Sequence, residues 1–129
     1  MDYRRLFSEV RDRPGLYGLD GSFRGFCAFV HGADAGNDWQ LLAGFRESLV
    51  VRVGAGNNLT WPALVLRLAW PDVDTGWLEL VTQPDRNRTA VDALFSLLEE
   101  YLDRRAVADG LVTIFDEYLT WLKAQDWYR

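Results

Sequence analysis

The sequence has almost no cysteine and almost no histidine, with one residue of each among 129 positions. A single cysteine, Cys27, excludes an internal disulfide and agrees with a reducing compartment such as the cytoplasm. A structural zinc site needs about four ligands, and Cys27 and His31 supply only two. The residue types present therefore predict neither a metal nor a cofactor.

The sequence also lacks a long apolar run. The stretch from Pro62 to Leu66 ends at Arg67, far short of the ~20 apolar residues that cross a bilayer. Residues 1–5 are charged and lead into mixed sequence without the apolar core of a signal peptide. These features predict a cytoplasmic chain that does not enter a membrane.

Positive charge is the scarcer sign, since 14 Lys and Arg residues face 19 Asp and Glu residues for a net charge of −5. Binding of nucleic-acid phosphates needs a basic face, so this balance argues against nucleic acid as a direct ligand. It is compatible with a basic protein partner. All basic residues except Lys123 are arginine, a usage typical of GC-rich genomes, which favours a bacterial source.

Apolar residues are abundant, at 49% of the chain, and no repeat or linker divides it. This content suits a single domain with one core. Apolar residues recur at helical spacing from the first turn onward. The first predicted helix starts after Asp2, a good N-cap, and ends before Pro14. The second starts after Asp20 or Ser22.

The third predicted helix starts after Asp38 and runs to Val53, although its β-branched end could form a strand instead. The fourth starts at Thr60 or Trp61 and carries Pro62 in its first turn. Residues 71–86 are expected to be mostly loop, with a short helix or strand at 77–81.

The last third predicts two further helices. One spans 87–106, and the other follows Gly110 with Leu111, Phe115, Tyr118 and Leu122 on its buried side. Short connections imply antiparallel neighbours. The predicted fold is therefore all-α, a single compact domain over residues 1–129 with five to six antiparallel helices.

Enzyme signatures are sparse. Cys27 and His31 are four residues apart, a spacing that suits a helical Cys/His pair, but a buried cysteine that acts as a small apolar residue is far commoner. The Gly54-Ala55-Gly56 loop lacks the third glycine of a dinucleotide motif, because position 59 is leucine. We therefore expect no catalysis. A small enzyme that uses Cys27 and His31 remains an alternative.

Aromatic and acidic residues suggest binding instead. Tryptophan dominates binding hot spots, because it buries a large area with few rotors. Carboxylates spaced along 87–106 form one helix face, and two more on the last helix could extend it. The candidate partner-binding residues are Asp92, Glu99, Asp103, Asp116, Glu117, Trp39, Trp77 and Trp121. A further alternative is a pocket for a small apolar ligand lined by Phe26, Trp61 and Trp70.

One short stretch resembles a known family. Arg13, Pro14, Gly15 and Tyr17, with Leu16 where methionine is usual, are followed by Ser22 and Phe23. This pattern resembles small bacterial proteins that begin Arg-Pro-Gly-Met-Tyr, are encoded beside polymorphic or contact-dependent toxins and are regarded as immunity proteins. The resemblance implies neutralisation of a cognate toxin by occlusion, and the acidic chain leads us to expect a basic toxin.

Within this motif we expect Arg13, Pro14, Gly15 and Tyr17 to be structural. Gly15 is expected to have a positive φ, and Tyr17 to be largely buried with its hydroxyl paired.

Overall fold

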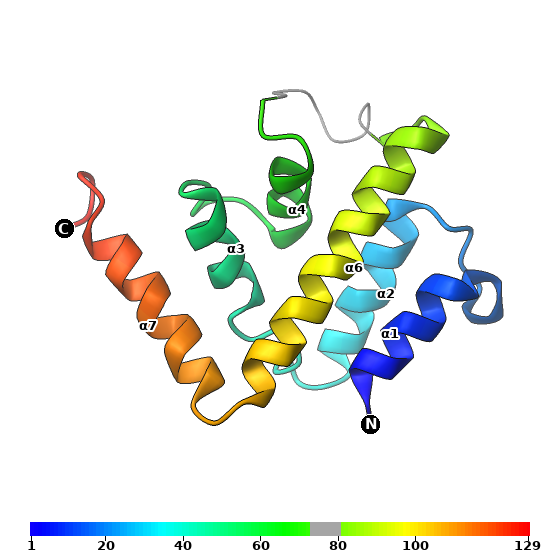
Figure 1. The fold of residues 1–129 in the computed structure, drawn as a ribbon, viewed down its shortest axis with the longest axis horizontal. Coiled ribbons are helices and arrows are strands. Elements are labelled where there is room, and N and C mark those ends of the chain that lie inside the picture. The colour runs from blue at the N-terminus through cyan, green and yellow to red at the C-terminus, as the bar shows by residue number, and fades with distance from the viewer. Residues whose placement is uncertain (73–80) are drawn as a thin grey trace.

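The computed structural model describes residues 1–72 and 81–129, and within these ranges all regular structure is helical (Figure 1). This confirms the all-α prediction. The elements are α1 (Tyr3–Asp12), the 3₁₀ helix η1 (Pro14–Tyr17), α2 (Phe23–Ala35), α3 (Phe45–Val53), α4 (Trp61–Ala69), α6 (Pro84–Ala106) and α7 (Gly110–Lys123). None of the described helices is both long and apolar enough to cross a membrane.

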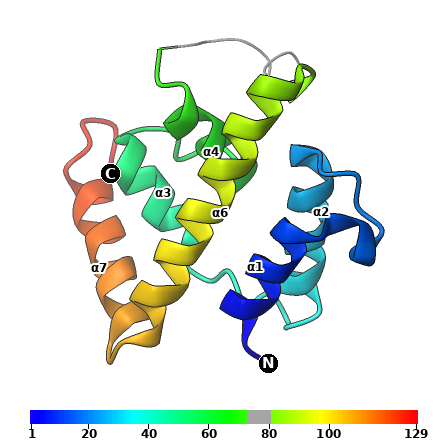
Figure 2. The same cartoon turned by 45° about the vertical axis from the view of Figure 1, so that its right-hand side comes forward.

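Helix α6 is the centre of the fold. It runs between α1 and α2 on one side and α3, α4 and α7 on the other (Figures 1 and 2). Phe26 of α2 meets Phe95 of α6 edge-on, with ring centroids 5.0 Å apart. On the other side, the ring of Phe45 in α3 lies 5.2 Å from that of Tyr101 in α6. Both groups of helices thus share one core built on α6.

The first corner follows the sequence prediction in outline. The Asp2 carboxylate accepts a hydrogen bond from Arg5 N at 3.1 Å and caps α1, which ends at Asp12. The prediction for Gly15 is wrong, because residues 14–17 form a 3₁₀ helix and Gly15 has no positive φ. The left-handed residue is Gly18, with φ of 73°. It ends the 3₁₀ turn, where only a residue without a Cβ is free of strain.

The start of α2 is fixed by side chains. Ser22 Oγ accepts a hydrogen bond from Gly25 N at 3.1 Å, as expected of an N-cap. From α6, Asn87 Oδ1 accepts a hydrogen bond from Phe23 N at 2.8 Å, and Asn87 Nδ2 donates to Gly21 O at 3.0 Å. The first turns of α2 and α6 are thereby joined.

Residues 36–44 form a series of turns, so the prediction that a helix starts after Asp38 is wrong. Asp38 and Trp39 have φ of 56° and 62°, and Gly44 has φ of 85°. A right-handed helix cannot pass through such residues, and α3 begins only at Phe45. The buried Asp34 carboxylate stabilises the turns by accepting a hydrogen bond from Leu42 N at 2.9 Å.

The two C-terminal helices differ from the sequence prediction in where α6 begins and in which side chain of α7 is buried. α6 begins at Pro84, three residues before the predicted start, because proline suits the first helical position. On α7, Ile114 rather than Phe115 is the buried residue. Trp77 lies outside the described residues, as does the short element expected at 77–81 except for its last position.

Candidate functional site

An open groove of about 810 Å³ lies between the two groups of helices that α6 joins. One wall comes from α2, and the other comes from the start of α4 and the loop before it. Most of the lining is apolar. The groove is lined by Cys27, Ala28, His31, Gly32, Arg46, Asn57, Asn58, Leu59, Thr60, Trp61 and Pro62.

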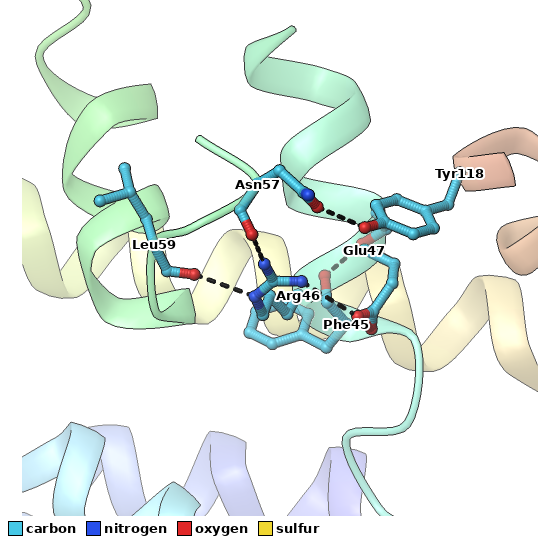
Figure 3. A network of polar contacts seen from close by, with 7 residues as sticks. Phe45, Arg46, Glu47, Asn57, Leu59 and Tyr118 are labelled. Atoms are coloured by element: carbon cyan, nitrogen blue, oxygen red, sulfur yellow. Dashed lines mark hydrogen bonds and ion pairs between the residues drawn. The ribbon is translucent and has the colours of Figure 1, made fainter. Parts of the chain in front are cut away.

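The α3–α4 loop takes its shape from Arg46. Arg46 Nε donates to Leu59 O at 2.9 Å, Nη2 donates to Asn57 O, and Nη1 lies 3.3 Å from the Glu47 carboxylate (Figure 3). The guanidinium is partly buried, and each of its three nitrogens makes one of these contacts. Arg46 therefore holds the loop that forms one wall of the groove.

The same loop is joined to α7. The Tyr118 hydroxyl donates a hydrogen bond to Asn57 Oδ1, while the Asn57 carbonyl is held by Arg46 (Figure 3). Asn57 thus connects α3, the groove wall and α7. Arg46 and Asn57 are not among the residues predicted from the sequence, where their only signal is the glycine-rich loop beside them.

Trp39 stands at the rim of the groove. Its ring meets that of His31, a lining residue, with centroids 5.2 Å apart and an interplanar angle of 61°. The side chain is 56% exposed although its backbone has a positive φ, which is a genuine outlier for a bulky residue. The Asp34 carbonyl holds this conformation by accepting a hydrogen bond from Trp39 N at 2.9 Å. Such strain is concentrated at functional positions.

Cys27 and His31 both line the groove, as the alternative of a small enzyme would require. Burial, however, raises the pKa of the Cys27 thiol to about 12. A thiol with this pKa is protonated at neutral pH and is a poor nucleophile. Within residues 1–72 and 81–129, no three His, Cys, Asp or Glu side chains gather to hold a metal ion.

We expect Cys27 to resist alkylation. In the folded protein at pH 8, its reaction with iodoacetamide should be at least about 30-fold slower than in concentrated urea, because the raised pKa depletes the thiolate and greater nucleophilicity offsets only part of the loss. The measurement is the rate of mass increase in each condition. Equal rates would contradict the assigned burial of the thiol.

The acidic stripe on α6, formed by Asp92, Glu99 and Asp103, is exposed to solvent, and its carboxylates form ion pairs with arginines of α1. Asp92 pairs with Arg11 at 2.5 Å, and Arg4 pairs with Glu99 at 2.8 Å and with Asp103 at 2.9 Å. Helix α1 lies along this face and supplies both arginines. A basic partner would therefore compete with α1 for these carboxylates.

The stripe gives a stability prediction. The triple variant Asp92→Lys/Glu99→Lys/Asp103→Lys should lower the free energy of unfolding by about 1–2 kcal/mol, since three exposed attractions become repulsions. Urea unfolding measures the loss. Adding Arg4→Glu and Arg11→Glu should recover most of it. An unchanged midpoint in the triple variant would show that these ion pairs contribute nothing.

The remaining candidates are dispersed. Glu117 pairs with Arg104 at 2.8 Å, and Asp116 is exposed on α7. Trp121 is half-buried against the ring of Tyr118, at a centroid distance of 6.2 Å. Of the three residues proposed for a small-ligand pocket, Trp61 lines the groove, whereas Phe26 and Trp70 do not. Phe26 packs against Phe95 of α6 instead.

The motif of residues 13–17 forms a corner beside α2. Tyr17 is half-buried rather than largely buried, with its ring 5.6 Å from Phe29 in an edge-on contact. Partial burial and the Glu9 carboxylate, to which its hydroxyl donates a hydrogen bond, raise the pKa of Tyr17. Pro14 is half-buried, whereas Arg13 is exposed. Tyr17 is therefore less buried than expected, although its ring packs against Phe29 of α2.

Comparison of the chain with protein-family models, curated proteins and solved structures gives no match.

Proposed function

We propose that this chain is a non-catalytic protein-binding domain that neutralises a cognate bacterial toxin by covering it. The observation that carries the proposal is Trp39, an exposed aromatic side chain held in a strained backbone at the rim of an open apolar groove. A tryptophan in this setting has the properties of a binding hot spot. The resemblance of residues 13–17 to immunity proteins names the class of partner.

The groove and Trp39 make different contacts with the toxin in this proposal. Trp39 inserts between side chains of the toxin, and the groove accepts an apolar side chain in return. The net charge of −5 speeds the encounter with a basic toxin, while the desolvated aromatic contact slows release. The protonated Cys27 thiol takes no part in chemistry and serves as an apolar part of the wall.

The proposal is tested with the C-terminal domain of the protein encoded by the neighbouring gene. Wild-type chain should bind this domain and restore growth of cells that express it. Trp39→Ala should weaken binding about 30-fold or more, the loss expected for a hot spot of ~2 kcal/mol. Trp127→Ala is the matched control, since Trp127 is also 56% exposed but lies at the C-terminal end of the chain.

Ala28→Phe adds a second variant, because Ala28 lines the groove and is exposed, so the new ring fills the groove without entering the core. It should also weaken binding. Unchanged affinity in both groove variants would overturn the proposed surface. A wild-type chain that neither binds nor protects would overturn the proposed function.

A small apolar ligand is a second candidate occupant, favoured by the groove volume, which falls within the range of about 300–1,000 Å³ typical of ligand pockets. Its test is a thermal-shift screen with apolar compounds on wild type and Ala28→Phe. Stabilisation of the wild type alone would support it.

A further inference from the structure

Helix α7 has an apolar surface that its own domain does not cover. Val112, Phe115 and Leu119 are 67%, 39% and 46% exposed, and Leu122 next to them is half-buried. Their spacing of three, four and three residues is that of the a and d positions of two heptads. Helix α7 lies at the edge of the molecule with α3 on its inner side (Figures 1 and 2). The exposed fractions of Val112, Phe115 and Leu119 show that the stripe is open to solvent.

Two opposite charges flank the stripe on the same side. Asp116 follows Phe115, and Lys123 follows Leu122, so both occupy e positions one heptad apart. Neither has an ion-pair partner among residues 1–72 and 81–129. The opposite flank, at the g positions, holds Leu111 and Tyr118, which are partly buried in the domain.

This arrangement is complementary to itself. We propose that the α7 stripe binds the α7 stripe of a second copy of this chain in antiparallel orientation. A two-fold axis beside Leu119 and Thr120, the two residues at the centre of the stretch from Asp116 to Lys123, brings each Asp116 opposite the second copy's Lys123. Antiparallel helices place e opposite e, so both ion pairs form at once. A parallel pair would place each charge opposite the uncharged g flank and satisfy neither.

The dimer is expected to be weak. A 14-residue helix is about 21 Å long, and one such helix from each copy buries less area than a permanent dimer needs. Association should therefore depend on protein concentration. The proposal is independent of toxin binding, because the α7 stripe contributes no residue to the groove.

Sedimentation velocity over a series of protein concentrations tests the proposal. The wild-type sedimentation coefficient should rise from the monomer toward the dimer value. Leu119→Glu should stay monomeric throughout, since it places a charge beside the axis. Thr113→Lys is the matched control, because Thr113 is exposed on α7 away from the stripe, and it should associate like the wild type.

A charge exchange tests the orientation. Asp116→Lys and Lys123→Asp should each lower the association constant about tenfold, because each single variant turns both ion pairs of the dimer into pairs of like charges. The double variant restores opposite charges in both pairs and should restore the association constant. A wild type that is monomeric at every concentration would overturn the proposal, as would a double variant no better than the singles. Trp39→Ala should dimerise normally, so loss of toxin binding and loss of dimerisation can be told apart.

Discussion

Replacement of Gly110 by alanine is expected to lower the free energy of unfolding by about 3 kcal/mol. Gly110 is buried at the first position of α7, where the chain turns back from α6. A Cβ there would lie 2.2 Å from Arg104 O and 2.9 Å from Arg105 Cα. Both are backbone atoms at the end of α6, so no side chain can rotate away, and the two helices must separate.

Urea unfolding followed by circular dichroism measures this loss. Gly15→Ala is the matched control, because a Cβ at Gly15 has no neighbour within 4 Å and its φ is not positive. That variant should keep wild-type stability or gain about 0.5 kcal/mol through the lower entropy of the unfolded chain. A Gly110 variant as stable as the control would show that the turn after α6 adapts freely.

Replacement of Tyr101 by phenylalanine is expected to cost about 2 kcal/mol. The buried Tyr101 hydroxyl contacts the carbonyls of Leu41 and Ala43 and accepts a hydrogen bond from Arg105 Nη1 at 3.1 Å. It thereby fastens the turns of residues 36–44 to the end of α6. The variant keeps the ring and removes only the oxygen, so the packing is unchanged. The Ala43 carbonyl loses the hydroxyl as its partner, whereas the Leu41 carbonyl keeps a hydrogen bond from Arg105 Nη1.

The loss of unfolding free energy in Tyr101→Phe should depend on pH. Burial of the hydroxyl raises the pKa of Tyr101 to about 12 from 10.0, although the nearby Arg105 works in the opposite direction. A raised pKa in the folded state means that the stabilisation is fully present below pH 10 and is lost as the pH rises from 10 to 12. The stability difference between wild type and Tyr101→Phe should therefore be constant below pH 10 and shrink above it.

Unfolding curves of both proteins from pH 7 to the alkaline limit measure this difference, and the comparison cancels the titration of Cys27 and Tyr17. A difference that stays constant up to pH 12 would contradict the assigned role of the hydroxyl.

Local signals in the sequence predict most helix ends. Asp2 and Ser22 act as caps, and Pro14 stops α1, because each of these effects depends on residues within a few positions. The turns at 36–44 were missed for the opposite reason. Trp39 takes a left-handed conformation that its residue type disfavours. The segment is held in place by the buried Asp34 and by the Tyr101 hydroxyl, which lies about 60 positions away in the sequence.

The site was predictable only in part. Trp39, Cys27, His31 and Trp61 were each noticed, but their meeting at one groove depends on how α6 joins the two groups of helices. Periodicity also places Asp92 on an outer face of its helix, as the structure does, without revealing that Arg11 of α1 forms an ion pair with it.

The central place of α6 also has a consequence for synthesis on the ribosome. Helices α1 and α2 are made first, yet their apolar side chains, such as Phe7 and Phe26, pack against α6, which is complete only at Ala106. At about 5–20 residues per second, translation of residues 36–106 takes roughly 4–14 s. Helices α3 and α4 are neighbours in the chain and can pair sooner. The helices that are translated first are thus among the last to be covered, and during this interval they are open to chaperones.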